Sequence, residues 1–100
     1  MKSQKRVAEF IEKYEMDGTP EFRILDLVSE VGEVAKDATK SSEYGINPEN
    51  ISVKKDEIGD VLFSLLAVAE SLDIDAEEAL EVALNKYEKR IEDKGDPGSE

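Results

Sequence analysis

Apolar residues recur with helical spacing along almost the whole chain, and this pattern predicts four helices. In the first stretch, residues 3–16, the apolar positions follow an i, i+3, i+4, i+7 spacing. Similar periodicity predicts helices over residues 20–40 and 53–72, and a fourth that begins after Asp75. No stretch of useful length alternates with the period of a strand. The sequence therefore predicts an all-α fold of four helices, mostly antiparallel neighbours, in a single domain of residues 1–100.

Residues that favour helix ends mark the first boundary. Asp17 and Gly18 form a stop signal, in which glycine supplies the left-handed conformation past a helix end. Thr19 is predicted as the N-cap of the second helix, with Pro20 at its first position. The first two helices are therefore expected to be joined by a short turn.

Similar signals mark the later boundaries. Residues 41–50 are rich in turn formers and are predicted to form a loop. Ser52 is the expected N-cap of the third helix. Asp75, with Glu78 three positions later, resembles a capping box that opens the fourth helix. Gly95 and Pro97 are predicted to end the fourth helix, and the tail, residues 95–100, is expected to be flexible.

The third predicted helix differs from the others because it is apolar on nearly every side. From Val61 to Ala69 only Ser64 interrupts the apolar run. A helix of this kind is usually central and buried. Three other short helices cannot easily cover it in a chain of 100 residues. We therefore expect helices from two or more copies to form one bundle, as a homodimer or a homotetramer.

One acidic pattern occurs twice, once in each of the two central helices. Glu-Val-Gly-Glu-Val begins at Glu30, and Glu-Ile-Gly-Asp-Val begins at Glu57, 27 positions later. The two acids of each copy, Glu30 with Glu33 and Glu57 with Asp60, are three residues apart and lie on one face of a helix. We expect all four carboxylates to converge where these helices face each other. Because close carboxylates repel one another, the arrangement favours a divalent cation, for which carboxylates are preferred ligands.

A glycine separates the two acids in each copy of the pattern. Gly32 and Gly59 each cost up to about 1 kcal/mol of helix propensity relative to alanine. A close approach of the two helices at these positions would compensate for that cost. The alternative is that the acids are ordinary solvated residues, but two matched pairs, one on an otherwise apolar helix, favour the metal site.

Composition narrows the chemistry. The chain has no cysteine and no histidine, which excludes disulfides, thiolate or imidazole metal sites and Ser-His-Asp catalysis. Any metal must be held by oxygen, which favours Mg²⁺, Mn²⁺ or Ca²⁺. The net charge of −12 disfavours nucleic acid and anionic membranes as partners but not cations. With neither a signal peptide nor a membrane span in the sequence, we expect a cytoplasmic protein.

The double acidic motif resembles that of the MazG-like family of all-α nucleoside triphosphate pyrophosphohydrolases. The family pattern E-x-x-E, a spacer and E-x-x-D is matched by Glu30, Glu33, Glu57 and Asp60, with 23 residues between the halves. The resemblance covers residues 22–92. It implies Mg²⁺, for which Mn²⁺ could substitute, held by these four acids. It also implies hydrolysis of a nucleoside triphosphate to the monophosphate and pyrophosphate, as a house-cleaning activity on nucleotide pools.

The resemblance also implies residues that contact the substrate. A downstream K-x-x-x-R pattern of the family, which contacts phosphate, is matched by Lys86 and Arg90. The alternative is a basic cluster favoured by the dipole at a helix C-terminus. Lys36 is a further phosphate candidate, and Asn85 is a candidate contact to the base or ribose. The available aromatic side chains are expected mostly in the core rather than as stacking platforms for the base (Phe10, Tyr14, Phe22, Tyr44, Phe63, Tyr87).

Two other classes of function stay open. The chain could be a non-catalytic acidic helical bundle that acts as an interaction module. It could also carry a related dUTPase or phosphoribosyl-ATP pyrophosphohydrolase activity on a similar scaffold. A panel of substrates would distinguish these activities. If Lys86 and Arg90 do not function in phosphate binding, the interaction module is favoured, because the chain would still bind metal but would not hold phosphate.

Overall fold

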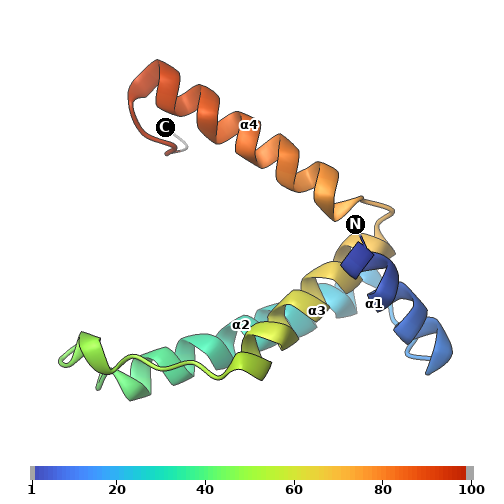
Figure 1. Ribbon diagram of the computed structural model, residues 1–100. Coiled ribbons are helices and arrows are strands. Elements are labelled where there is room, and N and C mark those ends of the chain that lie inside the picture. The colour runs from blue at the N-terminus through green and yellow to red at the C-terminus, as the bar shows by residue number, and fades with distance from the viewer. Residues whose placement is uncertain (1, 99–100) are drawn as a thin grey trace.

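The protein is all-helical, as predicted. A computed structural model describes residues 2–98, and within that range no residue lies in a strand (Figure 1). The elements are four α-helices and one short 3₁₀ helix: α1 (Lys2–Lys13), α2 (Pro20–Ser41), η1 (Pro48–Asn50), α3 (Lys55–Ser71) and α4 (Ala76–Lys94). No helix in this range is both long and apolar enough to cross a membrane.

Helix α3 lies at the centre of the packed part of the molecule. It runs antiparallel to α2 along most of its length and contacts α1 near its C-terminal end (Figure 1). The small core is carried by α3, whose residues Leu66 and Ala67 each expose only 2% of their surface. The prediction of a central third helix is confirmed. Its outer side is open, however, because Leu62 and Leu65 remain 48% and 46% exposed.

Helix α4 does not pack back against the other helices. It leaves the end of α3 after a short turn and extends away from the α2–α3 pair (Figure 1). The predicted antiparallel neighbour relation therefore holds for α2 and α3 but is wrong for α4. A short connection limits the distance between two helix ends but does not fix the angle between the helices. The apolar positions of α4 consequently stay open, with Leu80 and Leu84 each 49% exposed.

Gln4 ties α1 to the turn between α3 and α4. Its side chain is buried, donates to the Ile74 carbonyl at 2.8 Å and to the Glu70 carboxylate at 3.1 Å, and accepts from the Ala76 amide at 2.7 Å. The Ala76 amide is one of the unpaired donors of the first turn of α4. Gln4 thus links α1 to the end of α3, to the turn that follows it and to the start of α4.

Three of the predicted helix ends are confirmed. The Thr19 hydroxyl accepts from the Phe22 amide at 3.3 Å and caps α2. The Asp75 carboxylate accepts from two amides of the first turn and caps α4. Gly95 ends α4 with φ of 87°, in the left-handed region that favours glycine. Of the predicted flexible tail, 95–98 are described and the last two residues lie outside the described range.

Two predicted signals are wrong. Ser52 does not cap α3, which begins at Lys55 after an N-cap without a side-chain bond. The Ser52 amide instead donates to the Ser41 hydroxyl at 2.7 Å and closes the loop. Gly18 does not supply the left-handed residue after α1, because that conformation belongs to Glu15, with φ of 51°. Polar residues near a helix end offer several local bonds, and tertiary contacts decide which one forms.

Candidate functional site

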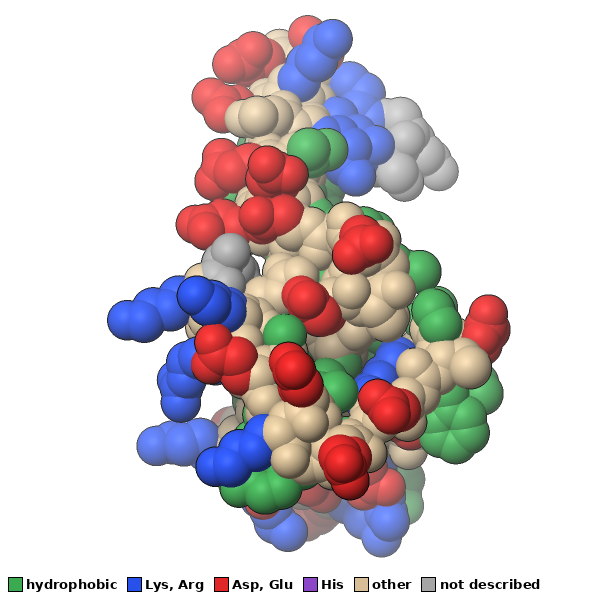
Figure 2. Space-filling model, turned by 90° about the vertical axis from the view of Figure 1, so that its right-hand side faces the viewer, with side chains coloured by type: hydrophobic (Ala, Val, Ile, Leu, Met, Phe, Trp, Pro, Cys, Tyr) green, Lys and Arg blue, Asp and Glu red, His purple; other side chains and the backbone are tan. Residues whose placement is uncertain are grey.

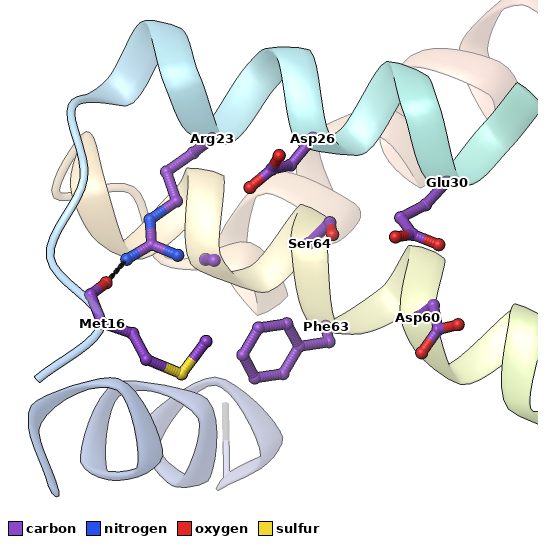
Figure 3. Close-up of a pocket in the computed structure, with 8 residues that line it drawn as sticks. Met16, Arg23, Asp26, Glu30, Asp60, Phe63 and Ser64 are labelled. Carbon is purple, nitrogen blue, oxygen red and sulfur yellow. Dashed lines mark hydrogen bonds between the residues drawn. The ribbon is translucent and has the colours of Figure 1, made fainter. Parts of the chain in front are cut away.

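A cavity of about 230 Å³ lies between α2 and α3 and contains two acids of the repeated motif. Glu30 comes from α2 and Asp60 comes from the first turns of α3, and both side chains reach the same end of the cavity (Figure 3). The antiparallel packing of the two helices brings the acids together although they are 30 residues apart in sequence. The lining consists of Met16, Arg23, Asp26, Glu30, Asp60, Phe63, Ser64 and Ala67.

A third motif acid, Glu57, faces a different carboxylate. A hydrogen bond with Asp37 of α2, together with burial and repulsion between the two charges, raises the pKa of Glu57 to about 7. Glu57 Oε2 is buried and has no hydrogen-bond partner among residues 2–98. A buried, unsatisfied carboxylate oxygen is costly unless a proton or a cation compensates it.

The fourth motif acid, Glu33, is exposed on α2. Within residues 2–98, no group of three or more acidic side chains is arranged to hold a metal ion. The four carboxylates therefore do not all converge as expected, since Glu30 and Asp60 share the cavity while Glu57 faces Asp37.

The residues present nevertheless suit a hard divalent cation. All candidate donors are carboxylate oxygens, which Mg²⁺ and Mn²⁺ prefer. The two copies of the motif lie on two facing helices. Within each copy, the two acids are about one helical turn apart. The unsatisfied oxygen of Glu57 is an available ligand. The role of Glu30, Glu33, Glu57 and Asp60 as metal ligands stays a prediction. The chemistry of their oxygen atoms agrees with it.

The two motif glycines do not mark a close approach of helices within the chain. A Cβ atom added at Gly32 or at Gly59 would meet no atom within 4 Å. The expected steric reason for these glycines is therefore wrong for α2 and α3 in one copy. Nothing else in the single chain accounts for them.

The predicted phosphate-binding residues lie away from the acids. Lys86, Arg90 and Asn85 are on α4, which extends away from the α2–α3 pair (Figure 1). Arg90 donates to the Pro97 carbonyl at 3.3 Å, and Lys86 Nζ lies 5.2 Å from the centroid of the Tyr87 ring. Lys36 is exposed on α2, one turn beyond Glu33. One chain alone thus brings none of these groups into the cavity.

Sequence reasoning missed three charged residues near the site: Arg23, Asp26 and Asp37. Arg23 and Asp26 line the cavity beside Glu30, and Asp37 faces Glu57. Their spacing carried the signal, because positions 23, 26, 30, 33 and 37 differ by steps of three or four, which place residues on one side of a helix. The double motif drew attention to its own acids and away from this longer stripe.

Acidic side chains outnumber basic ones in the chain, 25 to 13. Figure 2 shows Asp and Glu side chains scattered over one face of the molecule, including the length of α4. The net charge of −12 is therefore spread over the surface and not gathered in the cavity. An anionic substrate would need local cations to approach this surface.

The placement of motif acids on two facing helices agrees with a comparison to known families. Residues 18–94 match the family model of the MazG nucleotide pyrophosphohydrolase domain. The chain belongs to the MazG family. The matched segment contains all four motif acids as well as Lys86 and Arg90. The resemblance predicted from the sequence is confirmed.

Two further similarities come from one relative in Bacillus subtilis (strain 168). The chain is 39% identical over 72 residues to the uncharacterized protein YpjD, a segment that spans 68% of this chain and 63% of YpjD. A crystal structure of the "putative pyrophosphatase YPJD" from Bacillus subtilis superposes with a TM-score of 0.70 at 34% identity. That alignment covers 87% of this chain and 90% of the other. The description of that structure as a putative pyrophosphatase agrees with the match of this chain to the MazG family model.

Proposed function

We propose that the protein is a Mg²⁺-dependent nucleoside triphosphate pyrophosphohydrolase. It would hydrolyse the anhydride between the α- and β-phosphates, consuming one water and releasing a nucleoside monophosphate and pyrophosphate. The observation that carries the proposal is the pair of motif acids, Glu30 and Asp60, in one cavity between α2 and α3 of a MazG-family chain. A role in removing surplus or non-canonical nucleotides is consistent with this reaction.

The metal would be held by the repeated acids. Glu30, Glu33, Glu57 and Asp60 supply only oxygen ligands, and Glu57 Oε2 lacks any other partner within residues 2–98. When bound, Mg²⁺ or a substituting Mn²⁺ neutralises phosphate charge and lowers the pKa of a bound water. The acids themselves orient the cation and the water that they hydrogen-bond.

The basic residues of α4 would act from a second copy of the chain. Lys86 and Arg90 offer cationic donors for phosphate oxygens, Lys36 offers another from α2, and Asn85 offers an amide to the base or ribose. Because α4 leaves its own α2–α3 pair, we propose a homodimer or homotetramer in which its apolar side is covered and its polar side meets a neighbouring site. The exposed Leu80, Leu84 and Ile91 support this arrangement.

The test is pyrophosphate release from a panel of ribo- and deoxyribonucleoside triphosphates, with Mg²⁺ and with EDTA, by the wild type and by Glu57→Gln. Release that requires Mg²⁺ and that Glu57→Gln lacks is expected. The panel includes dUTP and phosphoribosyl-ATP, so that a preference for either identifies the related activity. If a correctly assembled wild-type protein releases no pyrophosphate from any of them, the proposal fails.

The second candidate, a non-catalytic interaction module, is favoured by the open apolar side of α4. It predicts metal binding without turnover. It also predicts that replacing Lys86 and Arg90 leaves Mg²⁺ binding unchanged and reduces capture of a protein partner. The triphosphate panel distinguishes it from the first proposal.

A further inference from the structure

The cavity between α2 and α3 has two chemically different ends. Glu30 and Asp60 lie at one end, and Met16, Arg23 and Phe63 lie at the other (Figure 3). Arg23 and Glu30, at the two ends, are seven residue steps apart along α2, a rise of about 10 Å. A metal and phosphates at the acidic end would leave the far end for another part of the substrate.

The far end suits a flat, partly apolar group. The ring of Phe63 forms one wall, and Met16 lies beside it (Figure 3). The Phe63 ring is steadied by Phe10 of α1, with ring centroids 5.9 Å apart and planes nearly perpendicular. The whole cavity, at about 230 Å³, is smaller than pockets that enclose a complete drug-sized ligand. The cavity therefore suits part of a nucleotide, with the rest extending beyond it.

The polar groups at this end are one cation and one anion. Arg23 donates through one terminal nitrogen to the Met16 carbonyl, which holds its guanidinium beside the segment that precedes α2 (Figure 3). Arginine has five N–H donors and no acceptor, so most of its donors remain available. Asp26, three residues along the same side of α2, is an acceptor when ionised. Arg23 is the one basic side chain among the eight residues that line the cavity.

We propose that Met16, Phe63, Arg23 and Asp26 form the nucleobase subsite of this enzyme, and that it selects bases with a ring carbonyl beside an N–H. This inference rests on the proposed function. Guanine, hypoxanthine, uracil and thymine present a carbonyl acceptor next to an N–H donor, which matches Arg23 and Asp26 respectively. Adenine and cytosine present the reverse order, an amino donor next to an acceptor nitrogen, so a base held in the same orientation would mismatch both contacts. A mismatched base would lose its contacts with Arg23 and Asp26 and would react less efficiently than a matched one.

The experiment compares kcat/KM for GTP, ITP and UTP with kcat/KM for ATP and CTP, all with Mg²⁺. The wild type is expected to prefer the first group by about five-fold or more, the lower limit for one well-placed contact to a base. Arg23→Met and Asp26→Asn are each expected to reduce this ratio toward one. Asp26→Asn does so because an amide can donate as well as accept. Lys40→Met, which removes a cation from the last turn of α2, is the matched control and should keep the wild-type ratio.

The outcomes test the proposed base subsite and the proposed reaction separately. Mg²⁺-dependent turnover with equal kcat/KM for the two groups of bases overturns the subsite and leaves the proposed function standing. Absence of turnover with every triphosphate overturns the proposed function. If Arg23→Met fails to fold because its bond to Met16 is lost, which circular dichroism would reveal, the wild-type ratio and Asp26→Asn still decide. A ratio unchanged in folded Arg23→Met shows that Arg23 serves only to hold the loop before α2.

Discussion

The α2–α3 pair and α4 both carry apolar residues at helical spacing, yet they differ in what covers those residues. Leu66 and Ala67 of α3 are almost fully buried against neighbouring helices. Leu84 and Ile91 of α4 remain 49% and 51% exposed, although they lie on the apolar side predicted from the sequence. Amphipathic periodicity therefore shows that a helix has a side to bury, but not which helix buries it.

The candidate functional residues are divided between the same two regions, the α2–α3 pair and α4. The acids that suit a cation lie on α2 and α3, where antiparallel packing brings Glu30 and Asp60 to one cavity. The basic residues that suit phosphate lie on α4, outside that pair. If the proposed function is correct, one helix pair holds the metal and a helix from another copy supplies the phosphate contacts. The predictions below test this division.

The largest effect is expected from the acids of the α2–α3 pair. Asp60→Asn should lower kcat/KM for triphosphate hydrolysis by about 100-fold or more, because even groups that only orient metal ligands contribute 10- to 100-fold. Its melting temperature without metal should stay the same or rise, because repulsion from Glu30 is relieved. Pyrophosphate release and thermal melts in EDTA measure the two quantities.

The control for Asp60→Asn is Glu49→Gln, which removes a carboxylate from η1, away from the cavity. It should keep wild-type turnover. Full activity in both Asp60→Asn and Glu57→Gln would show that the motif acids are not the catalytic site.

The next effect concerns the apolar side of α4. Leu84→Asp should convert the proposed homo-oligomer to a monomer, because a charge would be buried at the contact between copies. Multi-angle light scattering over a range of concentrations measures the mass. Val82→Asp, at an α4 position that is 67% exposed and off the apolar side, is the matched control and should stay oligomeric. A wild-type chain that is folded and monomeric at every concentration would disprove the proposed assembly.

A smaller effect is expected from the basic residues of α4. Replacing Lys86 and Arg90 together by methionine should lower kcat/KM about ten-fold or more, since hydrogen bonds to charged groups contribute about 1.5–3 kcal/mol each. Steady-state kinetics with the preferred triphosphate provide the measurement. Lys94→Met, in the last turn of α4, serves as the control. Equal kinetics in the double variant and the wild type would place phosphate recognition entirely on the α2–α3 pair.

The smallest effect is a pH dependence of stability in the metal-free protein. The folded chain raises the pKa of Glu57 from 4.5 to about 7, so it binds this proton more tightly than the unfolded chain does. The resulting stabilisation is complete below about pH 4.5 and is lost as the pH rises through about 7. Thermal melts in EDTA from about pH 5 to about pH 8 should therefore show a decline.

Both partners of the carboxyl pair serve as tests of that decline. Glu57→Gln and Asp37→Asn should each reduce this decline of stability with pH. Glu57→Gln removes the carboxyl group that binds the proton, and Asp37→Asn removes the neighbouring carboxylate that raises its pKa. Glu49→Gln should keep the wild-type slope. A slope that is identical in all four proteins would show that this pair does not couple to folding.

Several features of the fold could be read directly from local sequence. Thr19 before Pro20 and Asp75 before the last helix were correctly predicted as caps, because a side-chain oxygen beside unpaired amides acts over two or three residues. Ser52 and Gly18 show where such reasoning fails. The Ser52 amide donates to Ser41, eleven positions earlier, and no local signal reveals that partner.

The candidate site was predictable to a similar degree. The repeated motif identified Glu30 and Asp60, which share a cavity, and Glu57, which is half-buried. It did not identify Arg23 or Asp26, which line the same cavity, because neither residue belongs to the repeat. It also did not reveal that Glu57 faces Asp37, since that pairing depends on the register of two antiparallel helices.

The sequence by itself determined the all-α class, the four helices, most of their caps and the acids that suit a divalent cation. Each of these depends on residues within a turn or two of one another, or on which side chains are present at all. The tertiary structure alone decided the register of α2 against α3, the meeting of Glu30 with Asp60 and Phe63 in one cavity, and the direction of α4. Those features depend on packing between segments far apart in the chain, and the period of apolar residues carries no information about which surfaces meet.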